Sequence, residues 1–150
     1  MYVRQVMSKN IISATDDTPL PKIWQLIFTK HIHGLPIVDK NKKLLGIISE
    51  EDILSKLFPD YQDIDSPPID DDQVIQEKVV KLQALTAKKI MNPRVVFTRV
   101  DSHIMRALAR MIVRKVRQLP VLDENNKLIG MISKGDIFDW LFKTKPKLSR

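Results

Sequence analysis

The chain has 150 residues, of which 43% are apolar, and it contains no cysteine. This composition suits one compact domain or two small halves, and it excludes a disulfide framework, a thiolate metal site and a cysteine nucleophile. No apolar run approaches the roughly 18 residues of a membrane span, and the first residues, MYVRQVMSKN, lack the apolar core of a signal peptide. We therefore expect a cytoplasmic protein with no membrane partner.

The formal net charge of +7 is unevenly distributed. Residues 59–86 carry seven acids and two lysines, a net charge of −5, which leaves +12 on the rest of the chain. A basic body favours anionic partners such as nucleotide phosphates, nucleic acid or an acidic protein surface. Solvation of an ordinary surface by lysine explains the same charge equally well.

The segment 1–58 predicts the order β-α-β-β-α. Ile11-Ile12 forms a short strand, and a helix follows with Thr18 as N-cap and Pro19 at its first position. LPIV and LLGIIS are strands joined by the polar turn DKNKK, and the second strand, nearly all apolar, is expected to be buried on both faces. EEDILSKLF closes the unit as a helix. The first helix carries an amphipathic apolar stripe, made of Leu20, Ile23, Trp24, Ile27 and Phe28.

The same pattern returns in the second half of the chain without a gap. HGLPIVDKNKKLLGIISEED at 33–52 matches RQLPVLDENNKLIGMISKGD at 117–136. The second copy has its first strand at Val95–Phe97 and Ser102 as the helix N-cap. We divide the chain into copies at 1–58 and 85–142, an acidic linker at 59–84 with a helix from about 73 to 84, and a basic tail at 143–150. Two copies are too few for a solenoid, which needs at least about three, so a pseudo-symmetric pair is predicted.

Each copy has a Ser-x-x-Asp motif where its last strand meets its last helix, from Ser49 to Asp52 and from Ser133 to Asp136. One interpretation is a capping box, in which serine and acid each accept from the other's backbone amide. The other is ligand binding, because a helix N-terminus attracts phosphate and a carboxylate accepts ribose hydroxyls. Glycines three residues before each serine allow a close approach of backbone or ligand. Both interpretations stay open at this point.

The chain closely resembles a tandem pair of CBS domains, also called a Bateman module. The resemblance rests on LPIVD, GIISEED and ILSKLF in the first copy, on LPVLD, GMISKGD and IFDWLF in the second, and on the preceding VMSKN and IMNPR. It implies an α/β fold of two β-α-β-β-α repeats packed as a pseudo-twofold pair. It also implies a regulatory module that binds an adenine nucleotide, such as AMP, ADP or ATP, in clefts between the repeats and signals by conformational change. S-adenosylmethionine and NAD are further candidates.

For the site, the resemblance implies that the aspartates hold ribose and that the serines lie near ribose or phosphate. The segment after the first methionine flanks adenine, and the residues before Leu-Pro meet phosphate. In the first copy these residues are Asn10, Ile12, His33, Gly34, Ser49 and Asp52. In the second copy they are Arg94, Val96, Arg117, Gln118, Ser133 and Asp136. With two arginines, the second copy is expected to bind phosphorylated adenosine more tightly.

No catalytic motif is present: GxxxxGK[ST], GxSxG and HExxH are all missing, so no enzyme is predicted. His31 and His33 have no third metal ligand in view, and Asp70–Asp72 lacks the spacing of a calcium loop, so no metal site is predicted. The expected partners are a second copy, contacting through the apolar helix stripes, and an unidentified effector protein. The alternative is a structural module with degenerate clefts that binds protein or nucleic acid through basic faces. Nucleic acid is not favoured, since no aromatics interleave the basic run Arg106–Arg117.

Overall fold

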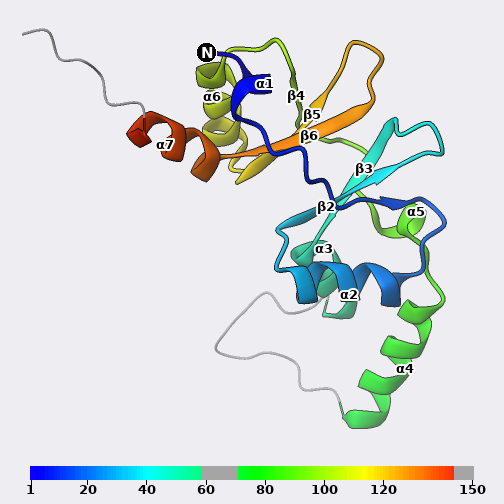
Figure 1. The fold of residues 1–150 in the computed structure, drawn as a ribbon. Coiled ribbons are helices and arrows are strands. Elements are labelled where there is room, and N and C mark those ends of the chain that lie inside the picture. Colours follow the sequence, from blue (N-terminus) through cyan, green and yellow to red (C-terminus); the bar gives the residue numbers. More distant parts are fainter. Residues whose placement is uncertain (59–70, 144–150) are drawn as a thin grey trace, which may run out of the picture. The chain divides into compact units, whose positions relative to one another are not determined.

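The computed structural model describes residues 1–58 and 71–143, which form two compact units (Figure 1). Unit 1 contains Met1–Ile12, Asn41–Leu44 and the described residues from Val95 onward. Unit 2 contains Ser13–Lys40 and the described residues of Leu45–Arg94. Each unit holds a three-stranded sheet with helices, so the predicted α/β class is confirmed.

Unit 2 carries the first copy of the repeat. In its sheet the strand order is β1-β2-β3, and β1 runs parallel to β2 with Ala14 opposite Ile37. Its strands are β1 (Ala14–Thr15), β2 (Gly34–Val38) and β3 (Leu44–Ser49). Its helices are α2 (Leu20–Lys30), α3 (Glu50–Leu57), α4 (Asp72–Gln83) and α5 (Ala87–Ile90). Six aliphatic side chains that are at most 2% exposed lie in its core: Ile23, Ile27, Leu35, Ile37, Ile48 and Ile53.

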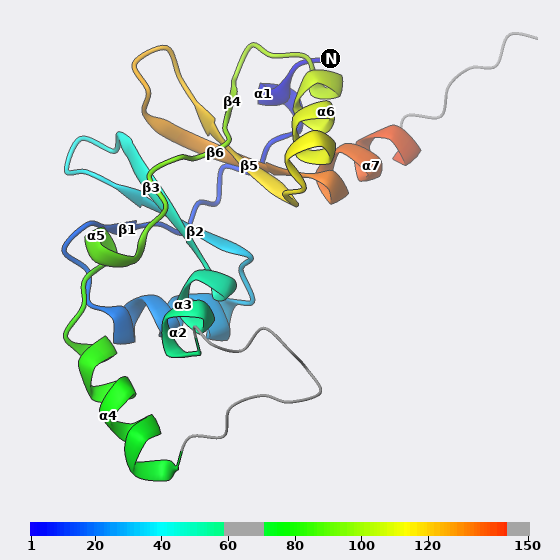
Figure 2. The same cartoon turned by 180° about the vertical axis from the view of Figure 1, so that it is seen from behind.

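Unit 1 repeats this arrangement with the second copy (Figure 2). Its sheet has the order β4-β5-β6, in which β4 is parallel and β6 antiparallel to the central strand β5. Its strands are β4 (Thr98–Arg99), β5 (Gln118–Leu122) and β6 (Leu128–Ser133). Its helices are α1 (Val3–Val6), α6 (Ile104–Arg114) and α7 (Lys134–Lys143). The core cluster consists of Val3, Ile104, Ala107, Leu108, Met111, Leu119, Val121, Ile132 and Ile137.

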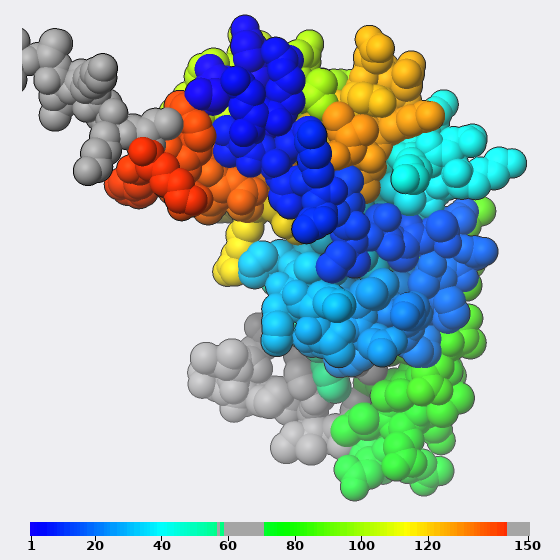
Figure 3. All heavy atoms as spheres, in the orientation of Figure 1, coloured from blue at the N-terminus to red at the C-terminus, as the bar shows by residue number. Residues whose placement is uncertain are grey.

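The segment that begins each copy is built into the unit of the other copy. In unit 1 the amide of Val3 donates to the carbonyl of Ser102 at 2.8 Å, and Ser8 and Met131 exchange backbone bonds of 2.8 and 3.0 Å. Figure 3 shows the dark-blue N-terminal segment lying against the orange and red atoms of the second copy.

Unit 2 has the same bonds at the equivalent positions of the repeat. Ala87 donates to Thr18 at 2.9 Å, and Asn92 and Ile47 exchange bonds of 2.9 and 3.0 Å. Each repeat therefore completes its core with a segment from the other. The division of the sequence at 1–58, 59–84, 85–142 and 143–150 stays a prediction about the repeat, and the compact units do not follow it.

The N-terminal segment of each copy thus packs in the unit of the other copy, and we call these two stretches the exchanged segments. Two predictions at the start of each copy are incorrect. Ile11-Ile12 and Val95–Phe97 are not strands, and the strands begin at Ala14 and Thr98. The N-caps are Pro19 and His103, not Thr18 and Ser102. Carbonyls of the exchanged segments accept from the first helical amides, because Leu20 donates to Leu85 and Ile104 donates to Met1. The hydroxyl of Thr18 instead accepts from the amide of Thr15, at 3.1 Å.

The expectation that LLGIIS and LIGMIS are buried on both faces is half correct. Burial alternates along both strands, with Gly46, Ile48, Gly130 and Ile132 buried and their neighbours half-buried. Alternation is the pattern of a strand that packs one face tightly on a core, and the other face is partly exposed. The apolar run alone does not distinguish these cases.

The predicted linker helix is present as α4, where the carboxylate of Asp71 accepts from the amide of Val74 at 2.9 Å. The rest of the predicted linker, including Asp70, and the tail after Lys143 lie outside the described residues. Across residues 1–58 and 71–143, every helix is too short or too polar to cross a bilayer.

Candidate functional site

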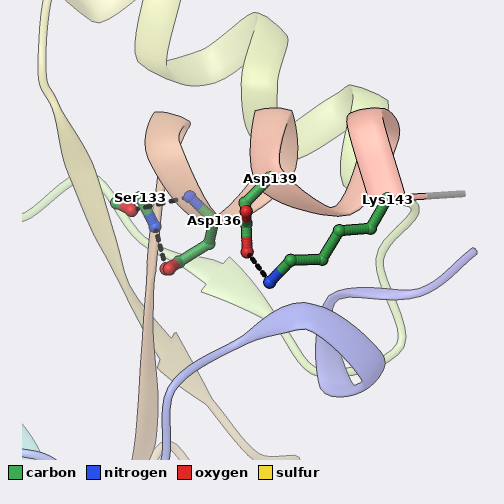
Figure 4. Close-up of polar contacts among 4 residues, drawn as sticks. All are labelled: Ser133, Asp136, Asp139 and Lys143. Atoms are coloured by element: carbon green, nitrogen blue, oxygen red, sulfur yellow. Dashed lines mark hydrogen bonds and ion pairs between the residues drawn. The ribbon is translucent and has the colours of Figure 1, made fainter.

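The Ser-x-x-Asp motifs form closed capping boxes in both copies. In unit 1 the amide of Ser133 donates to Asp136 Oδ2 at 2.9 Å, and the amide of Asp136 donates to Ser133 Oγ at 3.0 Å (Figure 4). In unit 2 the matching distances are 2.8 Å and 3.2 Å, and the hydroxyl of Ser49 also donates to Asp52 Oδ2 at 2.9 Å. The structural interpretation of the motif is therefore confirmed.

Capping does not use the whole carboxylate. Every bond that Asp52 and Asp136 accept from the described residues ends on Oδ2, which leaves Oδ1 of each with unused lone pairs. Both aspartates are half-buried, and the box fixes their orientation. A fixed carboxylate with one unused oxygen is an acceptor ready for hydroxyl groups. Capping and ligand binding are therefore compatible at the same residue.

The residues before Leu-Pro lie beside this box in unit 1. Gln118 is paired with Ser133 across the sheet, and the carbonyl of Arg117 accepts from the amide of Lys134 at 3.1 Å. Arg117 is exposed, so its guanidinium side chain is accessible to a ligand at this corner. The structure thus brings together four predicted residues in unit 1, namely Arg117, Gln118, Ser133 and Asp136.

Unit 2 has the corresponding corner, with histidine and glycine in place of arginine and glutamine. Gly34 begins β2, the strand that neighbours β3, and β3 ends at Ser49. Gly34 is buried and His33, just before it, is exposed. The strand ends therefore place His33 and Gly34 close to the Ser49–Asp52 box.

The segments expected to flank adenine do not reach these corners within either unit. The bridge between Ser8 and Met131 is antiparallel, so the chain after Ser8 runs toward the start of β6, away from Ser133. Asn10 and Ile12 follow this course in unit 1. In unit 2 the bridge between Asn92 and Ile47 directs Arg94 away from Ser49 in the same way.

The exchange also changes which predicted residues share a unit. Asn10 and Ile12 are predicted for the site of the first copy, but they lie in the unit that holds Ser133 and Asp136. Arg94 is predicted for the second copy, but it lies in the unit that holds the Ser49–Asp52 box, whereas Val96 lies in unit 1. Of the two arginines predicted for the second-copy site, Arg117 lies in unit 1 and Arg94 in unit 2, and the tighter binding of phosphorylated adenosine by the second copy stays a prediction.

Sequence reasoning missed two features. The first is Lys134, the half-buried first residue of α7, which follows Ser133 and adds a cation to that corner. The second is an apolar cavity of about 290 Å³ in unit 2 between α2, α3 and α4. It is lined by Leu20, Pro21, Trp24, Ile53, Val79, Leu82 and Gln83. The spacing of Val79 and Leu82 on the linker helix was the signal that could have predicted it.

Two of the three histidines, His31 and His103, lie at helix ends. His31 ends α2 in the left-handed region, with φ of 52°, and the Nδ1 atom of His103 accepts from the amide of Met105 at 3.1 Å. In the described part of the chain, no three histidine, aspartate or glutamate side chains are grouped to hold a metal ion.

Comparison with known proteins identifies the family. The CBS domain profile matches residues 3–59 and 87–143, and the chain belongs to the CBS domain family. A CBS domain-containing protein of Dictyostelium discoideum is 32% identical over 143 residues, which cover 95% of this chain and 92% of that protein.

Solved structures agree with this assignment at the level of the fold. CBSX2 of Arabidopsis thaliana in complex with AMP has a TM-score of 0.74 and 24% identity, covering 95% of this chain and 96% of that one. The CBS domain pair of protein MJ0100 in complex with 5′-methylthioadenosine and S-adenosylmethionine has a TM-score of 0.68 and 21% identity, covering 97% and 98%. The fold is therefore that of a CBS domain pair.

Proposed function

We propose that this protein is a non-catalytic regulatory module that binds an adenosine-containing ligand and transmits binding as a conformational change. The observation that carries the proposal is the pair of half-buried aspartates, Asp52 and Asp136, each held by a capping box with Oδ1 unused. The same acceptor occurs at the same place in both repeats. The adenosine compounds named for CBSX2 and the MJ0100 domain pair support this ligand class.

The proposed roles follow from the two corners. Asp52 and Asp136 accept ribose hydroxyls through Oδ1, because each Oδ2 is engaged with a backbone amide. Arg117 and Lys134 bind phosphate in the unit 1 corner, where charge-assisted bonds are strongest. His33 serves this purpose in the unit 2 corner. Asn10, Ile12, Arg94 and Val96 keep their proposed role at the adenine. Among adenosine compounds we propose AMP, ADP or ATP, which the basic residues favour.

A thermal melting scan with AMP, ATP, S-adenosylmethionine and NAD tests the proposal. A ligand at a hundredfold excess over its dissociation constant stabilises the folded state by about 2.7 kcal/mol. For a chain of this size that corresponds to a rise of roughly 5–10 °C in the melting temperature. The decisive variant is Asp52→Asn with Asp136→Asn. Its amide oxygen still accepts the capping bond, but its NH₂ group replaces the oxygen that accepts ribose.

We expect the double variant to melt near the wild-type temperature without ligand and to lose most of the ligand-induced rise. The matched control is Glu51→Gln with Asp139→Asn, which removes two neighbouring carboxylates outside the boxes and should keep the full rise. A rise that survives in the double variant would show that the ligand binds elsewhere. If none of the four compounds shifts the wild type, the ligand-binding proposal fails and a structural interaction module replaces it.

We further propose a homodimer that works in the cytoplasm and passes its signal to a separate effector protein. The apolar side chains exposed on the helices of both units support self-association, since exposed apolar surface usually marks an interface. On α2, α3 and α4 they are Trp24, Leu54, Val74, Val79 and Val80, and on α6 and α7 they are Met105, Ile112, Val113, Phe138, Leu141 and Phe142.

A further inference from the structure

The unit 1 corner carries positive charge at the start of α7. Lys134 is the first residue of this helix and Gly135 the second. A cation is unfavourable at a helix N-terminus, which has partial positive charge, and glycine is a poor helix former. Lys134 is half-buried and forms no ion pair with a residue that the structure describes, and Asp139, further along α7, is paired with Lys143 at 2.6 Å (Figure 4). Helix stability therefore does not explain Lys134 and Gly135, whereas an anion bound at the corner does.

The unit 2 corner has acids at the same two positions of the repeat. Glu50 and Glu51 begin α3, and both are exposed. Acids in the first turn stabilise a helix, so these two residues also have a structural explanation. They lie within one helical turn of Asp52, about 5.4 Å along the axis, which is shorter than the Debye length of about 8 Å at physiological salt. A ligand group near Asp52 is therefore in the electric field of two further carboxylates.

The net charges of the two corners have opposite signs. Arg117, Lys134 and Asp136 together give the unit 1 corner a net charge of +1. In unit 2, His33 stands in place of the arginine, and the three acids at 50–52 give this corner a net charge of −3 when histidine is counted as neutral. The two corners therefore share the carboxylate that accepts ribose but differ by four charges around it.

We propose that the two corners select adenosine compounds of opposite charge, and that Lys134 and Glu50 determine this selectivity. The unit 1 corner binds an adenosine with a 5′ phosphate, which pairs with Lys134 and Arg117. The unit 2 corner prefers an adenosine with a cationic 5′ group, because its carboxylates attract a positive charge and repel phosphate. With His33 as its one basic residue, it binds phosphate only weakly. This selectivity rests on the proposed function, because the 5′ group reaches a corner only when the capping aspartate holds the ribose.

Single capping variants of the full chain isolate each corner for isothermal titration calorimetry. Asp52→Asn leaves the unit 1 corner intact, and Asp136→Asn leaves the unit 2 corner intact. The probes are AMP, adenosine and 5′-amino-5′-deoxyadenosine, which carry a phosphate, a hydroxyl and an ammonium group at the 5′ position. We expect Asp52→Asn to bind AMP roughly tenfold more tightly than the ammonium compound, and Asp136→Asn to show the reverse order, because one charge-assisted bond supplies at least that factor.

The outcomes separate this selectivity from ligand binding itself. If both single variants prefer the same probe, the corners do not select by charge, although adenosine binding stands. If none of the three probes binds the wild type, the selectivity is also wrong. The melting scan with AMP, ATP, S-adenosylmethionine and NAD then decides independently whether the proposed function fails as well.

Charge reversal at the two determining positions tests their role. Lys134→Glu, in the variant that keeps the unit 1 corner, should lower the ratio of AMP affinity to ammonium-compound affinity by roughly tenfold or more. Glu50→Lys, in the variant that keeps the unit 2 corner, should raise the same ratio by a similar factor. Affinity for adenosine, which is uncharged, should change little in either variant and shows that the corner remains folded. The matched controls are Lys40→Glu and Glu124→Lys, exposed reversals in the hairpin turns, which should leave the ratio unchanged. An unchanged ratio in Lys134→Glu or in Glu50→Lys would overturn the proposal.

Discussion

Gly46 and Gly130 are required by the exchanged segments. A Cβ atom on Gly130 would lie 2.7 Å from Met7 Sδ and 3.0 Å from the carbonyl oxygen of Ser8. On Gly46 it would lie 2.7 Å from Met91 Sδ and 3.0 Å from the carbonyl oxygen of Asn92. From the sequence, either backbone or ligand could approach these glycines. The structure places backbone and a methionine of the exchanged segment there.

Gly130→Ala should therefore destabilise the protein. The methionine can move, but the carbonyl is fixed by the backbone bonds between Ser8 and Met131, so we expect a loss of about 1–3 kcal/mol, as in other overpacked sites. Chemical denaturation gives the free energy of unfolding directly. The matched control is Gly135→Ala in α7, where an added Cβ meets only Ser133 Oγ, at 3.6 Å. That change should stabilise the helix by roughly 0.5–1 kcal/mol. Equal effects of the two changes would contradict the close approach.

At the scale of the element, α1 and α5 have only four residues each and depend on their unit for stability. Isolated helices shorter than about 12 residues are marginal in water. Val3 is completely buried in the unit 1 core, and Ala87, its counterpart, is completely buried in unit 2. Packing against the other repeat therefore creates these helices, and local propensity does not.

Val3→Ala should lower the free energy of unfolding by about 2 kcal/mol, since it removes two buried methyl groups and leaves a cavity. In a protein of this size that is a drop of roughly 4–8 °C in the melting temperature. Lys9→Ala, an exposed change in the same segment, should stay within about 0.5 kcal/mol of wild type. If Val3→Ala is also neutral, the N-terminal segment does not contribute to the unit 1 core.

At the scale of the whole molecule, we expect two copies of the 17.4 kDa chain to associate through the exposed apolar residues on the helices of both repeats. Light scattering at micromolar concentration should give the mass of a dimer. Val80→Asp should dissociate it, because a charge placed in an apolar contact loses its hydration, and the 65% exposed side chain is not needed for folding. Lys40→Asp, an exposed change in the turn between β2 and β3, should leave the dimer intact. A wild type that is monomeric at this concentration would contradict the expectation.

Interactions within a few residues were enough to predict much of this protein. The apolar spacing of the first helices, the two hairpin strands and the linker helix follow from periodicity, and the Ser-x-x-Asp boxes follow from contacts three residues apart. Thr18 and Ser102 show the limit of such local reasoning. Both are favourable N-caps in isolation, but carbonyls of Leu85 and Met1 satisfy the first helical amides instead.

The tertiary structure alone decided which repeat each N-terminal segment completes. The segments at 1–8 and 85–92 occupy equivalent positions in the repeat, so the amino-acid pattern alone does not assign either segment to one core. Only the long-range bonds, such as those of Val3 to Ser102 and of Ala87 to Thr18, distinguish the two. The assignment of Arg94 and Arg117 to different units follows from the same exchange. A repeated sequence thus determines what each core requires, and three-dimensional packing determines which segment supplies it.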